Sequence, residues 1–255
     1  MKSFQIAYFS DKGARHEINQ DSFFVKKSHY REMQLVSAGV CDGMGGLAEG
    51  EKISGAAAAA LSGWTAENLR LIAEGDDGTV CRALTEKLDR LNARINGYNG
   101  RRQQSAGTTC VLLLLTEDRF TVCNVGDSRC YRLREGELVQ LSRDHSLAAQ
   151  LVEAGLLKEH DVKAFPQRNV LTQAIGTMSG IVPAFASGEA ACGDAFLLCC
   201  DGFYNELSET ELLALYGTEA DSASMKEKLR AAAGLARQRG ETDDITAILV
   251  KIKCE

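Results

Sequence analysis

Residues 33–46 of this 255-residue chain read MQLVSAGVCDGMGG, a mostly apolar run that ends abruptly in an Asp-Gly turn. The run has the length and composition of a buried strand, and Asp-Gly pairs typically follow such strands. A second stretch at 196–207, FLLCCDGFYNEL, repeats the pattern with Cys-Cys-Asp-Gly. Each stretch therefore places one carboxylate, Asp42 or Asp201, at the end of a buried strand.

Blocks of strand and helix patterns surround these two stretches. Apolar and β-branched runs predict further strands at 4–10, 21–28, 108–115, 119–126, 128–134, 137–142, 194–200 and 244–252. Segments without helix breakers predict helices at 48–71, 79–96, 209–216 and 222–239. Short polar turns join the four strands between 108 and 142, which predicts an antiparallel meander. Strand blocks separated from helical hairpins indicate an α+β layered fold.

The composition excludes several classes of protein. With 45% apolar and 25% charged residues, the chain has enough apolar surface for one compact domain over residues 1–255. Its formal charge of −6 excludes the basic field that attracts nucleic acid or anionic lipid. The start lacks a signal peptide, and apolar runs such as 111–115 are too short to span a membrane. We therefore expect a cytoplasmic protein.

The nine cysteines give no sign of a zinc site, since none stands in a Cys-x-x-Cys pair. Several lie inside apolar runs, where a reduced cysteine packs as a small hydrophobic residue.

Further acidic residues stand where strands begin. Asp243 and Asp244 stand at the start of the final strand, and Asp21 stands at the start of the second. In an antiparallel sheet, strand ends and strand starts share an edge, so these carboxylates can meet Asp42 and Asp201. Crowded carboxylates repel one another unless a cation lies between them, and oxygen ligands suit Mg²⁺ or Mn²⁺. One Asp-Gly pair alone is an ordinary turn, whereas the repetition favours a metal site.

Eight motifs, in order along nearly the whole chain, resemble those of the type-2C metal-dependent (PPM) serine/threonine protein phosphatases, bacterial branch. They are GARHEINQDSF at 13–23, VCDGMGG at 40–46, SAGTT at 105–109, NVGDSRCYRL at 124–133, LSRDHS at 141–146, LTQAIG at 171–176, FLLCCDGFYNEL at 196–207 and DDITAILV at 243–250. The resemblance implies a four-layer αββα sandwich, with two central antiparallel sheets flanked by helices. It also implies a centre with two Mn²⁺ or Mg²⁺ ions, or three where a weaker third site is filled.

The resemblance assigns the metal ligands position by position. Asp42 would bridge the two ions, the carbonyl of Gly43 would bind one, and Asp201 and Asp243 would complete the other. A water shared between the ions would then attack phosphorus in line, without a phosphoenzyme.

Other positions acquire roles through the same resemblance. Asp21 would orient waters from outside the ligand set, and Asp127 with Asp201 would hold the third ion. Residues 146–170 occupy the place of a flap beside the active site. The implied partners are phosphorylated proteins and a cognate bacterial Ser/Thr kinase, with no nucleic acid and no membrane, for an enzyme expected to be a monomer.

The chain departs from the family pattern at two positions. Where the family usually has an arginine that binds the substrate phosphate, this chain has His16, with Arg15 beside it. Either residue would contact the phosphate, and the bidentate geometry of a guanidinium favours Arg15. Asp244 replaces a common asparagine, which adds a charge that would tighten metal binding or alter its surroundings. Met44 is normal for the bacterial branch.

Three alternative functions compete with a metal-dependent phosphatase. Cys123 and Arg129 have the Cys-x5-Arg spacing of cysteine-dependent phosphatases, but Asp127 within that loop would repel a phosphate. The spacing of Gly43, Gly45 and Ala48 imitates a dinucleotide fingerprint without the expected parallel strand. A catalytically inactive sensor or scaffold of the same fold is the third alternative, and the intact Asp42, Asp201 and Asp243 argue against it.

Overall fold

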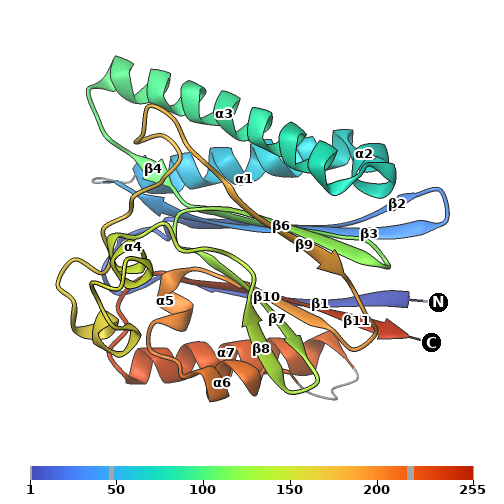
Figure 1. Ribbon diagram of the computed structural model, residues 1–255. Helices are drawn as coiled ribbons and strands as arrows, with labels where there is room; N and C mark the ends of the chain where they lie inside the picture. The colour runs from blue at the N-terminus through green and yellow to red at the C-terminus, as the bar shows by residue number, and fades with distance from the viewer. Residues whose placement is uncertain (1, 46–48, 217–220, 255) are drawn as a thin grey trace.

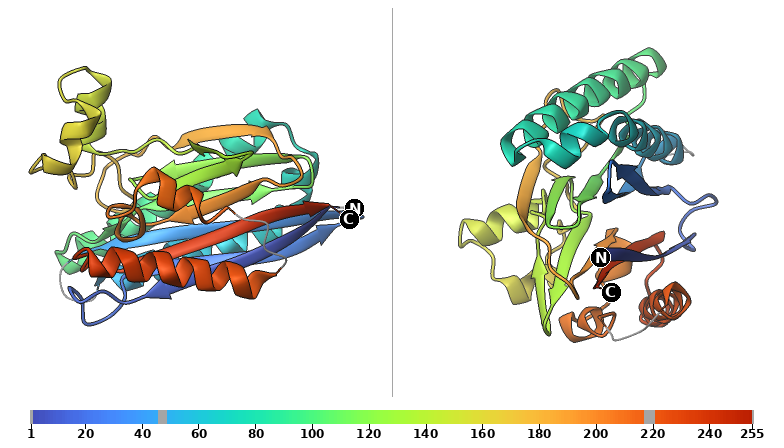
Figure 2. Two further views of the ribbon diagram at one scale, coloured as in Figure 1. Left: turned by 90° about the horizontal axis from the view of Figure 1, so that it is seen from below. Right: turned by 90° about the vertical axis from the view of Figure 1, so that its right-hand side faces the viewer.

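The computed structural model describes residues 2–45, 49–216 and 221–254 in four layers (Figure 1). Two antiparallel sheets lie face to face in the middle, and helices cover the outer face of each sheet. The two ends of the chain lie side by side at one end of the sandwich (Figure 2), where Lys2 pairs with Cys254. This architecture confirms the predicted αββα sandwich and its α+β class.

The first sheet has the strand order β2-β3-β5-β6-β9, with β4 attached to β3. Its strands are β2 (Asp21–Tyr30), β3 (Met33–Met44), β4 (Gly107–Thr108), β5 (Cys110–Leu115), β6 (Arg119–Val125) and β9 (Ala184–Glu189). The helices on its outer face are α1 (Glu49–Glu67), α2 (Leu69–Glu74) and α3 (Asp77–Arg102). Small buried side chains on α1, such as Ala57, let this helix lie close to the sheet.

The second sheet has the strand order β1-β11-β10-β7-β8. Its strands are β1 (Lys2–Asp11), β7 (Arg129–Arg134), β8 (Glu137–Gln140), β10 (Ala195–Cys199) and β11 (Ile245–Cys254). Its outer helices are α5 (Asp201–Tyr204), α6 (Glu209–Leu213) and α7 (Ser222–Gln238). Between β8 and β9, α4 (Leu147–Glu153) and the 3-10 helix η1 (Glu159–Ala164) stand away from the sheets (Figure 2).

Strand β5 shows why the central strands read as continuous apolar runs. All six of its residues are buried, because the second sheet covers one face and helices cover the other. Val111, Leu113 and Leu115 pack between the sheets, whereas Leu112 and Leu114 pack under the helices. Each such side chain contributes roughly 1.5–3 kcal/mol on burial, which fixes the strand register.

The predicted meander is wrong. The hairpins β5–β6 and β7–β8 belong to different sheets, because the chain crosses between them at Gly126, which has a φ of 99°. The predicted helix 48–71 is two helices, with Asn68 between them, and residue 48 lies outside the described residues. The sequence did not predict strand β9 or the four-residue helix α5.

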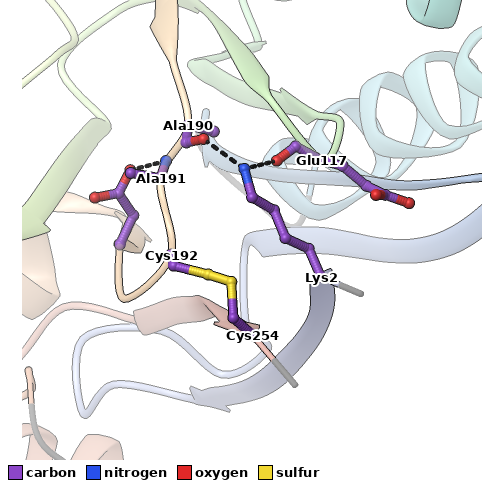
Figure 3. The surroundings of a disulfide bond; sticks show 7 residues. Lys2, Glu117, Ala190, Ala191, Cys192 and Cys254 are labelled. Carbon is purple, nitrogen blue, oxygen red and sulfur yellow. Dashed lines mark hydrogen bonds between the residues drawn. A yellow bond between two sulfur atoms is a disulfide. The ribbon is translucent and has the colours of Figure 1, made fainter.

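Two cysteines form a disulfide at the end where the termini meet. Cys192, in the loop between β9 and β10, is bonded to Cys254 at the end of β11 (Figure 3). Nearby, Lys2 donates hydrogen bonds to the carbonyls of Ala190 and Glu117. The buried cysteines in apolar runs, such as Cys110 and Cys123, are free thiols, as predicted.

In the described part of the chain, no helix is long and apolar enough to cross a membrane.

Candidate metal centre and active site

Four acidic residues meet at one edge of the sandwich. Asp42, near the end of β3, pairs with Asp21 at the start of β2. Asp201 opens α5 directly after β10, and Asp243 precedes β11, which pairs with β10. The structure therefore brings these strand ends and strand starts to one edge, as the sequence predicted.

One cavity of about 620 Å³ collects most of the predicted site residues. Its lining includes Asp42, Gly43, Asp127, Asp201, Asp243, Arg15 and His16. Asp21 does not line this cavity; it is 8% exposed and lines a separate pocket with Ser10 and Ser22. Residues that the sequence did not predict for the site also line it, namely Gln20, Thr109, Asn169, Leu171, Ala174, Thr177 and Met178. Several of these residues lie within or next to the motifs quoted in the sequence analysis. That proximity is the signal that could have identified them.

Strand β4 and its neighbour Thr109 hold Asp42 in place. The backbone N–H of Asp42 donates to Oγ1 of Thr109 at 3.0 Å, and its carbonyl accepts from Thr108 Oγ1 at 2.9 Å. Gly43 must be a glycine, because a Cβ there would lie 2.4 Å from the carbonyl oxygen of Gly50. The Gly-Thr-Thr motif therefore positions the Asp-Gly turn.

Burial raises the pKa of four carboxyl groups at this edge, those of Asp21, Asp42, Asp127 and Asp201. The pKa of Asp42 lies well above its usual value, because burial and the nearby charges of Asp21 and Asp201 disfavour ionisation. Burial also raises the pKa of Asp201 to about 6, that of Asp21 to about 7 and that of Asp127 to about 8. Without a cation, the site therefore resists carrying its full negative charge.

The donor atoms fit a hard divalent cation. Both carboxylate oxygens of Asp21 are buried without a hydrogen-bond partner among the described residues, which marks a place for further polar groups. Ligand atoms of Asp21, Asp42 and Cys200 lie within 4.8 Å of one another. Burial raises the pKa of Cys200 well above its usual value, so this group stays a neutral thiol. The charged donors are carboxylates, which suit Mg²⁺ or Mn²⁺.

Arg15 and His16 both border the cavity but have different partners. Nη1 of Arg15 lies 2.9 Å from Oδ2 of Asp243, and the Arg15 side chain is 62% exposed. Nδ1 of His16 lies 3.0 Å from Oδ2 of Asp244 and 3.6 Å from Oδ1 of Asp243. The carboxylate of Asp244 does not line the cavity but accepts from backbone N–H groups of residues 13 and 20.

The structure excludes the cysteine-dependent site. Cys123 is buried on β6, and burial raises the pKa of its thiol well above the usual value. Arg129 lies on the other sheet, where it pairs with Asp144 at 2.6 Å and stacks on Tyr204. The dinucleotide pattern fails too, because every strand pair in the described chain is antiparallel, and Ala48 lies outside the described residues.

A second cavity of about 580 Å³ adjoins the first beneath the segment 146–170. The two cavities share Asp127, Asn169 and Asp201. Arg129, Arg143 and Arg168 line the second cavity, together with acidic residues of the same segment. The segment expected to form a flap therefore borders the carboxylate site.

Comparisons with known proteins agree with this geometry. Residues 12–238 match the family model described as protein phosphatase 2C. The serine/threonine phosphatase Stp of Listeria monocytogenes is 29% identical over 245 residues, which cover 95% of this chain and 93% of the relative. The protein phosphatase PhpP of Streptococcus pneumoniae is 29% identical over 255 residues, with 98% of each chain covered.

Solved structures are similar over nearly the whole chain. Serine/threonine phosphatase Stp1 from Staphylococcus aureus has a TM-score of 0.82 and 26% identity, covering 99% of this chain and 96% of that one. The catalytic domain of serine/threonine protein phosphatase PstP, solved with two manganese ions, has a TM-score of 0.78, 27% identity and full coverage of both chains. The chain therefore belongs to the protein phosphatase 2C family.

Proposed function

We propose that this phosphatase hydrolyses phosphoserine and phosphothreonine in proteins, with two Mn²⁺ or Mg²⁺ ions held by Asp42, Asp201 and Asp243. The observation that carries the proposal is the crowding of carboxylates around one cavity, where Asp42, Asp127 and Asp201 form no ion pair with any described residue and Arg15 pairs with Asp243 alone. Bound divalent cations would supply an activated water and would offset the negative charge of the phosphoryl oxygens.

The side chains around the ions have distinct proposed tasks. The carboxylate of Asp42 and the carbonyl of Gly43 would hold the ions together with Asp201 and Asp243. The unpartnered oxygens of Asp21 accept hydrogen bonds from water inside the site. Asp127, which shares the cavity with Asp201, would help to hold a third ion more weakly.

Arg15 and His16 bind the substrate phosphate in this proposal. The partner of Arg15 is Asp243, and a cation at Asp243 would release the guanidinium for the substrate. Because the Arg15 side chain is largely exposed, it is free to turn toward a phosphate and bind it bidentately. His16 lies at the same cavity and supplies a second contact through its ring.

We also propose the setting in which the enzyme works. It acts as a single domain and a monomer in the cytoplasm, where it opposes a Ser/Thr kinase, and residues 146–170 act as a flap over the bound substrate. The cavity that residues of this segment line next to Asp127 and Asp201 supports the flap assignment.

Hydrolysis of phosphopeptides tests the proposal. The purified protein is mixed with matched phosphothreonine and phosphotyrosine peptides and Mn²⁺, with or without EDTA. We expect faster hydrolysis of phosphothreonine, complete inhibition by EDTA and no inhibition by a thiol alkylator. A folded, Mn²⁺-loaded protein that hydrolyses neither peptide would support the inactive scaffold, and inhibition by the alkylator alone would support a cysteine nucleophile.

A further inference from the structure

The loop at residues 13–20 crosses from β1 in the second sheet to β2 in the first, at the edge that carries the carboxylates. It contains Arg15 and His16 and has no regular secondary structure. Its backbone is therefore held by groups from elsewhere. Arg15 donates its N–H to the carbonyl of Thr242 at 3.0 Å, and Gln20 accepts at its carbonyl from Gly43 N–H at 3.1 Å.

The carboxylate of Asp244 ties the two ends of this loop together. Oδ1 accepts from the N–H of Gly13 at 2.7 Å, and Oδ2 accepts from the N–H of Gln20 at 2.7 Å. Oδ2 also lies 3.0 Å from Nδ1 of His16. Asp244 is 4% exposed, so these contacts are protected from water and are strengthened by its charge.

The contact with Asp244 also orients the imidazole ring. Because Nδ1 of His16 is engaged by the buried carboxylate, Nε2 is the ring nitrogen left for the cavity that His16 borders. One buried side chain therefore holds both ends of the loop and the imidazole ring that borders the cavity.

We propose that Asp244 is a positioning residue for substrate binding, which holds loop 13–20 so that Arg15 and His16 face the phosphate. This inference rests on the proposed function, since it assumes that a phosphate monoester enters the cavity. Asp244 itself does not line the cavity. Its effect is therefore expected on substrate binding more than on the chemical step.

Asp244→Asn tests this role with little change in shape. A carboxamide has one acceptor oxygen, so its NH₂ group must face the N–H of Gly13 or Gln20, and a buried donor loses its partner. We expect KM for a phosphothreonine peptide with Mn²⁺ to rise about 10-fold, while kcat changes less than about threefold. In the metal-free protein, hydrogen exchange of the amides in loop 13–20 should accelerate by about 10-fold or more.

Asp194→Asn is the matched control. Asp194 is also fully buried and accepts from a backbone N–H, that of Ala191 at 2.8 Å, and from the guanidinium of Arg134. It lies at the other end of β10, away from the carboxylate site. This variant should leave KM, kcat and exchange in loop 13–20 unchanged.

Gly13→Ala moves the loop by an independent route. An added Cβ would lie 2.2 Å from the carbonyl oxygen of Thr242 and 2.5 Å from that of Asp243, so the loop must shift away from both carbonyls although Asp244 is intact. We expect the same rise in KM as for Asp244→Asn. Melting temperatures verify that both variants fold. If only one of the two variants folds, that variant alone is sufficient for the test.

A fall in kcat with unchanged KM in Asp244→Asn would overturn the proposal, since it would indicate damage to the metal centre. Unchanged exchange in loop 13–20 would overturn it as well. An inactive wild-type protein would refute the proposed function, whereas the exchange measurement would still decide whether Asp244 holds the loop.

Discussion

The two ends of the sandwich treat buried carboxylates in opposite ways. At the end where the termini meet, Asp194 is fully buried and receives two hydrogen bonds of 2.6 Å from Arg134. At the other end, Asp42 and Asp21 are close neighbours, and no lysine or arginine in the described ranges forms an ion pair with either. Both ends are built from the same strands. They differ in whether a positively charged side chain pairs with these carboxylates.

This contrast shows what the carboxylate end lacks. A buried carboxylate paired with arginine keeps its charge and ties two segments together. Carboxylates crowded without such a partner destabilise the fold, which is tolerated where a ligand supplies the missing positive charge. The disulfide between Cys192 and Cys254 adds a covalent tie at the stabilised end only (Figure 3).

Asp42→Asn should give the largest effect. It removes a proposed metal ligand. Losing a group that only hydrogen-bonds to a metal ligand costs up to about 100-fold, so losing the ligand itself should lower kcat/KM with Mn²⁺ by more than about 100-fold. The melting temperature of the metal-free protein should rise, because one crowded carboxyl is gone. Retained activity across a Mn²⁺ titration, or a lower melting temperature, would contradict this contrast.

Cys192→Ser should reduce stability without affecting catalysis. The disulfide joins residues 62 apart in sequence, and closing a loop of that length stabilises a fold by about 4 kcal/mol in the chain-entropy model. Urea unfolding of the oxidised wild type and the variant measures this difference, and dithiothreitol should abolish it. Equal stability of the two oxidised proteins would show that the bond does not stabilise this end.

Asp194→Asn should have an effect opposite to that of Asp42→Asn. Breaking its pair with Arg134 should lower the free energy of unfolding by about 3 kcal/mol. This value is the lower end of the range for buried ion pairs, because a third of the Arg134 side chain is exposed. Activity should stay at the wild-type level. An increase in the stability of the metal-free protein would mean that the two ends do not differ as described.

The pH dependence of stability should come from the carboxylate end. Burial raises the pKa of Asp201, Asp21 and Asp127 to about 6, 7 and 8, so the folded protein binds more protons than the unfolded chain above pH of about 4. Stability of the metal-free protein should therefore fall as pH rises toward 8. Thermal melts in EDTA should show lower melting temperatures at higher pH.

Two further melts sharpen this prediction. Saturating Mn²⁺ should offset the loss at high pH, because the cation favours the ionised carboxylates. Asp127→Asn should flatten the slope in EDTA, since it removes one of the titrating groups. A melting temperature in EDTA that rises between pH 5.5 and 8 would contradict the assigned direction.

The sequence was most informative where strand pattern and chemistry coincided. Asp42 and Asp201 follow buried strands, and antiparallel pairing alone brings such positions to one edge. The hairpin β7–β8 was assigned to the wrong neighbours, because a short turn specifies the hairpin but not the sheet that it joins. Sheet membership depends on packing between distant segments.

Contacts made by loops were beyond prediction from the sequence. The added charge of Asp244 was expected to tighten metal binding or alter its surroundings, and no sequence pattern indicated that its carboxylate contacts backbone N–H groups of residues 13 and 20. The pairing of Cys192 with Cys254 had no signal either, since neither spacing nor hydrophobic pattern brings these two residues together. Such contacts depend on where the strands place the loops.

Crystals soaked in MnCl₂ and measured at the manganese absorption edge test the central claim most directly. We predict two strong anomalous peaks among the carboxylates of Asp42, Asp201 and Asp243, with a weaker third peak near Asp127. Anomalous maps without a peak among the first three carboxylates, at saturating Mn²⁺ and neutral pH, would contradict the account.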